Sequence, residues 1–178
     1  MTRYLELQVQ GVLAWLDQPP TSPAQRVFSG LLHLPRSAPL VAATLAEQFG
    51  LGLEDFSRAL FELNRSRSLR VTEQAYDHSA QFRADFALLC EDLRELGADR
   101  RQLLLATADG LCLAQHGLPE ESCIRQAALC HRGPSQEFPC MIPLHVGGHT
   151  IHLCSTQDID PSSAALLRLT RRLIGLHA

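Results

Sequence analysis

The chain has 178 residues, of which 46% are apolar, and a formal net charge of −3 at pH 7. This composition excludes bulk disorder, and the charge gives no overall attraction to nucleic acid or to an anionic membrane. No apolar run approaches the roughly 20 residues that a membrane helix needs, and the first residues do not form an export signal. We therefore expect a cytoplasmic protein whose six cysteines are reduced.

The N-terminal third is predicted to be helical. Apolar residues recur there at steps of four, three and four, which predicts one amphipathic helix that ends before the first pair of prolines. These residues are Leu5, Val9, Val12 and Leu16. Three more helices are expected at residues 24–34, 40–49 and 53–64, and Gly50 marks the end of the second of them.

Residues 43–63 resemble a helix-turn-helix, and the strand-like residues 69–71 follow where a winged helix places its wing. Four arginines near the second helix and the wing are candidates for contact with nucleic-acid phosphates. They are Arg58, Arg65, Arg67 and Arg70. Glu54 and Asp55 argue against this contact, because a recognition helix points its first residues at the bases. The pattern therefore predicts a winged-helix-like unit at residues 1–78 that contacts protein, with DNA binding as the alternative.

A second unit is expected at residues 79–178, after a polar link at residues 76–80. It begins with a strongly periodic helix from Phe82 to about Gly97. Two apolar strands then flank Asp109-Gly110, the strongest short-range hairpin signal, because both central residues of a type I′ turn need positive φ. Both faces of the first strand are apolar, which predicts a sheet that is covered on both sides.

The rest of the second unit predicts a helix, a hairpin and a helix. Pro119 and two glutamates begin the first helix, which is expected to run to about His131. Residues 138–146 and 149–155 predict a hairpin across two glycines, with Leu144 facing Ile151 and Ile142 facing Leu153. The last helix is expected to begin at Asp160-Pro161 and to direct three arginines outward. These are Arg168, Arg171 and Arg172.

This order of elements, together with the stretch Leu103-Leu-Leu-Ala-Thr-Ala-Asp-Gly-Leu-Cys-Leu-Ala114, resembles the roadblock (dynein light chain type) domain family. The resemblance implies an antiparallel sheet with helices on both faces and a homodimer formed through the middle helix and its neighbouring strand. It also implies binding to a small Ras-like GTPase or to a larger scaffold. The chain departs from the family between Arg132 and Val146, where one clear strand stands in place of two, so the usual dimer geometry is in doubt. A truncated GAF- or PAS-like sensor domain is the competing fold.

Histidine and cysteine side chains in the second hairpin are the candidates for a zinc or copper site. They are His145, His152 and Cys154. At most two of the ligands converge in the predicted hairpin, so we predict no metal site. On the middle helix, Cys123, Ala127 and Cys130 form a stripe of small residues that indicates close packing, either in the core or across a dimer or partner interface. Cys123 and Cys130 lie about 10 Å apart along the helix axis, too far for a disulfide between them.

The sequence contains no nucleophile elbow, no phosphate-binding glycine-rich loop with a lysine and no His-Glu-x-x-His motif. We therefore predict an α+β protein without enzymatic activity or cofactor. Its predicted role is that of a regulatory or adaptor protein that self-associates and binds a protein partner, with a small Ras-like GTPase as the first candidate. The alternatives are a DNA-binding transcription regulator with a C-terminal sensor domain and a metal- or redox-responsive module.

Overall fold

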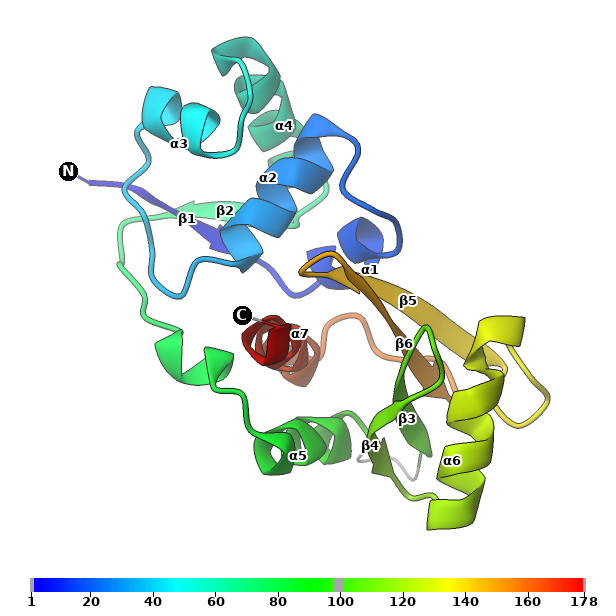
Figure 1. The fold of residues 1–178 in the computed structure, drawn as a ribbon. Coiled ribbons are helices and arrows are strands. Elements are labelled where there is room, and N and C mark those ends of the chain that lie inside the picture. Colours follow the sequence, from blue (N-terminus) through cyan, green and yellow to red (C-terminus); the bar gives the residue numbers. More distant parts are fainter. Residues whose placement is uncertain (1, 98–100, 178) are drawn as a thin grey trace.

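Two antiparallel sheets organise the chain in the computed structural model, which describes residues 2–97 and 101–177 (Figure 1). A two-stranded sheet pairs β1 (Tyr4–Leu7) with β2 (Leu69–Thr72). A four-stranded sheet has the strand order β4-β3-β6-β5. Seven α-helices surround the sheets within the described residues, so the fold class is α+β, as the sequence predicts.

Four helices lie between β1 and β2 along the chain. They are α1 (Gly11–Leu16), α2 (Pro23–Leu32), α3 (Ala42–Gln48) and α4 (Leu53–Arg65). A capping box begins α2, because the Ser22 hydroxyl accepts from the Gln25 N–H and the Gln25 side chain accepts from the Ser22 N–H. Gly50 follows α3 with φ +63°. The helices predicted at residues 24–34, 40–49 and 53–64 are therefore confirmed to within two residues at each end.

The prediction of one helix through Leu5 and Leu16 is wrong. Leu5 lies in β1 and pairs with Val71 of β2, and the helix begins only at Gly11. Leu5 and Val12 are both buried in one core, so the spacing of these apolar residues indicates that they are buried and does not indicate that one helix contains them. The strand expected at residues 69–71 is present, but it pairs with β1 and not with a strand that follows it.

The four-stranded sheet is made of two hairpins. They join β3 (Leu103–Thr107) to β4 (Cys112–His116) and β5 (Cys140–Val146) to β6 (His149–Ser155). The second hairpin has the predicted register, with Leu144 opposite Ile151 and Ile142 opposite Leu153. Its two glycines have φ of +59° and +82°, as a type I′ turn requires.

The first hairpin has a longer loop than its Asp-Gly pair predicts. Gly110 has φ +88°, whereas Asp109 has no positive φ. The Gly110 N–H donates to the Thr107 carbonyl oxygen, and the Thr107 N–H donates to the Leu111 carbonyl oxygen at 2.9 Å. The loop therefore contains three residues and needs only one residue in the left-handed conformation. The prediction of a two-residue type I′ turn is wrong, because the loop is one residue longer.

Helices cover both faces of the four-stranded sheet (Figure 1). On one face lie α5 (Phe86–Leu96) and α7 (Ala164–His177), and on the other lies α6 (Glu120–Leu129), which continues into a 3₁₀ turn, η2 (Cys130–Arg132). The helix predicted from Phe82 begins four residues later, because the Asp85 side chain accepts from two backbone N–H groups and caps α5. Residues Ser79–Phe82 form a separate 3₁₀ turn, η1.

One hydrophobic cluster joins the N-terminal helices to α5, α7 and one face of the four-stranded sheet. A second, smaller cluster lies between α6 and the opposite face. The polar link at residues 76–80 is anchored to the first unit, because the Tyr76 hydroxyl donates to the Leu5 carbonyl oxygen at 2.9 Å. The first of the two clusters contains buried side chains from both sides of the predicted boundary near residue 78.

The prediction that the arginines of the last helix face outward is wrong. Arg171 and Arg172 are 2% and 9% exposed. Arg172 donates to one oxygen of Asp92 on α5, and Arg168 donates to the other oxygen of the same carboxylate at 2.9 Å. Arg168 also pairs with Glu95. A buried ion cluster therefore joins α5 to α7.

Candidate functional site

The open edge of the four-stranded sheet is the side of β4. The other edge strand, β5, is packed against α1 and contains Pro143, which has no N–H to offer to another strand. Within the part of the chain that the structure describes, β4 pairs with β3 alone. Its outer side therefore presents the unpaired backbone groups with which an added strand would pair.

A groove of about 420 Å³ lies beside this edge, between α5, β4 and α6. Its lining residues are Cys90, Cys112, Leu113, Ala114, Gln115, Glu120, Cys123 and Ile124. Ile124 on α6 is 62% exposed, and Leu111 in the loop before β4 is 63% exposed. Large apolar side chains that remain exposed beside an open strand are typical of a protein-binding surface. We call this surface the β4–α6 groove.

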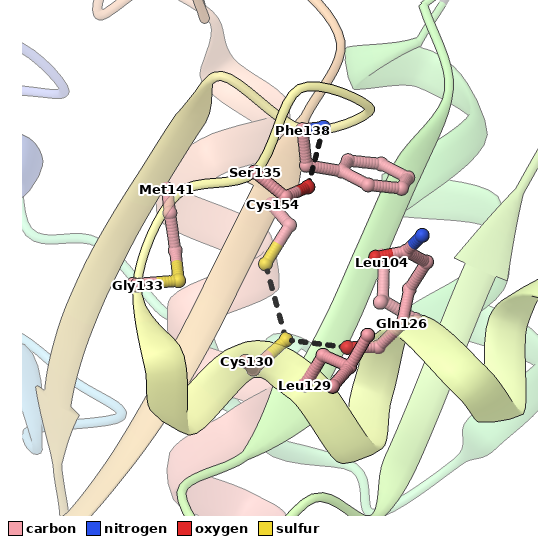
Figure 2. A pocket seen from close by; sticks show the side chains of 9 residues that line it. All are labelled: Leu104, Gln126, Leu129, Cys130, Gly133, Ser135, Phe138, Met141 and Cys154. Carbon is pink, nitrogen blue, oxygen red and sulfur yellow. Dashed lines mark hydrogen bonds between the residues drawn. The ribbon is translucent and has the colours of Figure 1, made fainter.

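Two pairs of cysteines connect α6 and the η2 turn that follows it to the sheet. In the groove, the sulfur of Cys112 on β4 lies 2.7 Å from the sulfur of Cys123 on α6. Deeper in the layer, Cys130 and Cys154 face one another across 3.4 Å, as Figure 2 shows. The thiol of Cys130 also donates to the carbonyl oxygen of Gln126.

The inner pair borders a cavity of only about 20 Å³, which has room for about one water molecule. Phe138, Leu104 and Met141 enclose it (Figure 2). The contact between the sulfurs raises the pKa of Cys154, with burial adding to the effect, and it lowers the pKa of Cys130. In the groove, burial and the hydrogen bond with Cys123 raise the pKa of Cys112 to about 12. A thiol with so high a pKa is protonated at neutral pH.

The stripe of small residues on α6 packs within its own chain. Cys123, Ala127 and Cys130 are 4%, 0% and 5% exposed, and the sheet covers all three. This burial agrees with the core-packing alternative, and the role of the three residues at a dimer or partner interface stays a prediction. The exposed side of α6 next to the groove is marked instead by Ile124.

The three candidate metal ligands do not converge on one point. The His145 ring is hydrogen-bonded to the Thr150 hydroxyl at 3.0 Å, and Cys154 is in contact with Cys130. Burial lowers the pKa of His152, and the nearby His145 lowers it further. Among residues 2–97 and 101–177, no group of three or more histidine, cysteine, aspartate or glutamate side chains is placed to hold a metal ion.

The arginines predicted as nucleic-acid contacts lie on the N-terminal unit, and carboxylates neutralise half of them. Arg58 pairs with Glu54 at 2.8 Å, and Arg70 pairs with Glu6 at 2.6 Å. Arg65 and Arg67 are exposed. The acidic start of α4 that argued against DNA contact is therefore also the partner of one of the candidate arginines.

The β4–α6 groove was not predicted from the sequence. Its walls come from three elements that local periodicity cannot place against one another, and the pairing of Cys112 with Cys123 depends on how α6 packs on β4. The one signal in the sequence was the stripe of small residues, which indicated a close approach of α6 to another element. No helix in the described ranges is long and apolar enough to cross a membrane. Comparison of the chain with protein-family models, curated proteins and solved structures finds no match.

Proposed function

We propose that this protein is a non-catalytic regulatory or adaptor module that self-associates through the β4–α6 groove and binds a protein partner. The observation that carries the proposal is the open edge of β4 beside a groove lined by the exposed Ile124, with a second exposed apolar side chain, Leu111, in the loop before β4. An unpaired strand edge gives affinity through backbone hydrogen bonds, and neighbouring apolar side chains give specificity.

We propose a second copy of this chain as the first occupant of the groove. Two β4 strands can pair antiparallel about a two-fold axis, which places the same surface of each copy in the interface. The Ile124 and Leu111 side chains then lie beside the new pair of strands and are covered by the partner copy. Burial of such side chains contributes roughly 1.5–3 kcal/mol each, which favours the dimer.

The finer fold assignment is part of this proposal. The antiparallel sheet with α5 and α7 on one face and α6 on the other supports a roadblock-like unit at residues 79–178. The helices α2, α3 and α4 support a winged-helix-like unit at residues 1–78, in which β1 supplies the strand that pairs with β2. The resemblance to roadblock domains makes a small Ras-like GTPase the first partner to test.

Sedimentation velocity on the purified chain tests the self-association. We expect the wild type to be a dimer and Ile124→Asp to be a monomer, because a carboxylate would be buried in the interface without a partner. Phe61→Asp is the matched control, since Phe61 is 69% exposed on α4, outside the groove, and should leave the dimer intact. A monomeric wild type, or a dimer that dissociates with Phe61→Asp and persists with Ile124→Asp, contradicts the proposal.

A pull-down with Ras-like GTPases from the same cell tests the partner. We expect the wild type to retain one of them and Leu111→Asp to retain less. Retention that is equal for both proteins would place the GTPase on another surface, and retention of none would remove this class of partner.

A further inference from the structure

The cysteine pair of the β4–α6 groove is close to the geometry of a disulfide. A disulfide has a sulfur–sulfur distance of about 2.05 Å, so the 2.7 Å between Cys112 and Cys123 must shorten by roughly 0.7 Å. Cys112 lies on β4 and Cys123 on α6, so a bond between them would join the two walls of the groove. Cys130, in the η2 turn that follows α6, and Cys154 on β6 also form a contact with the sheet, but their sulfurs are separated by 3.4 Å.

The two pairs differ in their access to reagents. Cys112 is half-buried and lines the groove of about 420 Å³. Cys130 and Cys154 are 5% and 2% exposed and border the cavity of about 20 Å³ shown in Figure 2. Cys123 is 4% exposed, so a molecule larger than water reaches the first pair through Cys112 and does not reach the second pair, as long as α6 stays in place.

We propose that Cys112 and Cys123 are a disulfide-forming modification site, which a low-molecular-weight disulfide oxidises while Cys130 and Cys154 remain thiols. In the first step the Cys112 sulfur loses its proton and attacks one sulfur of the reagent. The reagent's own disulfide breaks, a mixed disulfide forms at Cys112, and the displaced thiolate takes up a proton.

In the second step Cys123 attacks the Cys112 sulfur of the mixed disulfide. The bond to the reagent breaks, the second reagent thiolate leaves and accepts the proton that Cys123 gives up, and the protein disulfide is complete. Two protein thiols have lost two electrons, and the reagent disulfide has gained them as two thiols.

The surroundings of Cys112 predict how the first step depends on pH. The titratable groups that affect it are Cys123 and Cys130 on the α6 side and Cys90 on α5, and Glu120 also lines the groove. Because the pKa of Cys112 is raised to about 12, only a small fraction of it is thiolate near neutral pH. The rate should rise about tenfold for each pH unit between neutral and moderately alkaline pH, in proportion to that fraction.

A disulfide between α6 and β4 would fix the two walls of the groove relative to each other. Its effect on docking rests on the proposed function, whereas the formation of the disulfide does not. The two are measured separately, by protein mass and by sedimentation, so a failure of one is distinguishable from a failure of the other.

The test uses the fully reduced, full-length chain and oxidised glutathione, with alkylation of the remaining thiols before intact-mass measurement and peptide mapping. The chain has six cysteines, so we expect the wild type to lose two hydrogens and to be alkylated at the other four. Cys123→Ser should stop at the first step and carry one glutathione on Cys112. Cys112→Ser should form no groove disulfide, and Cys140→Ser, whose cysteine lies on β5 outside the groove, should form the same Cys112–Cys123 disulfide as the wild type.

Three results would overturn the proposal. The first is wild-type protein that keeps all six thiols at every pH used. The second is a stable glutathione adduct on the wild type that never resolves to a disulfide. The third is a peptide map that joins Cys90 to Cys112, or that shows Cys130 joined to Cys154 before the groove pair has reacted. Matching far-UV circular dichroism spectra ensure that each variant is compared in the folded state.

Discussion

Removal of the Asp92 carboxylate should destabilise the protein severely. Asp92 is 4% exposed and accepts hydrogen bonds from both Arg168 and Arg172, so it neutralises the charge between α5 and α7. In Asp92→Ala, Arg168 keeps its pairing with Glu95, but the Arg172 side chain, 11% exposed, has no counter-charge left in the cluster. Breaking a buried ion pair in this way costs about 3–5 kcal/mol. For a chain of this size that loss lowers Tm by roughly 6 to 20 °C.

Urea denaturation followed by circular dichroism measures this loss as a change in the free energy of unfolding. Glu95→Gln is the matched control, because the Glu95 side chain is 59% exposed and its ion pair should contribute less than about 1 kcal/mol. The double variant Asp92→Leu/Arg172→Met should recover most of the stability, since it removes the unpaired charge along with its partner. If Asp92→Ala costs no more than Glu95→Gln, the buried cluster does not hold α5 against α7.

Two further predictions concern backbone strain and pH. Gly110→Ala should lower the free energy of unfolding by about 2–3 kcal/mol, because Gly110 has φ +88° and an added Cβ would lie 3.0 Å from the Ala128 Cα. Gly148→Ala is the control: Gly148 has φ +82° with open space around it, so the loss should be only about 1 kcal/mol. Equal losses in urea denaturation would contradict the close contact with α6. Burial lowers the folded-state pKa of His78 and of His152, so as the pH falls these histidines bind protons in the unfolded chain before they do so in the folded chain. The free energy of unfolding should therefore decrease as the pH drops below about 6.5. Denaturation curves from pH 7.5 to 5 check this effect, and a double change of both histidines to glutamine should flatten the dependence; an unchanged slope would show that other groups cause it.

The second hairpin was predictable from the sequence because its determinants are local. Two glycines fix a type I′ turn, and the turn then fixes which residues of Cys140–Val146 and His149–Ser155 lie opposite each other. The helices α2 and α4 were also predictable, since their apolar periodicity and their end signals agree. Where one local signal allowed two outcomes, as at Asp109-Gly110, the sequence located the turn but not the length of its loop.

The errors arose where a distant element decides the outcome. Leu5 has a helical spacing to its neighbours, yet β2 offers it a strand to pair with. Arg171 and Arg172 belong to a polar stripe that predicts an exposed helix face. That face is instead buried, and Arg171 donates a hydrogen bond to Gln81 and Arg172 donates one to Asp92. The β4–α6 groove belongs to the same class, because nothing in the order of residues places Cys112 beside Cys123.

The α6 layer packs on a smaller hydrophobic cluster than α5 and α7 do. The cluster beneath α6 is small and is built largely from alanine and cysteine, whereas the opposite face of the sheet joins the core shared with the N-terminal helices. Small side chains bury little apolar area, so fewer contacts oppose a shift of α6 relative to β4. The close approach of Gly110 to Ala128 and the contact of Cys112 with Cys123 are two specific constraints on that shift. A bond between these two sulfurs would therefore change the groove more than a bond of equal strength between α5 and α7, which the larger core already holds in place.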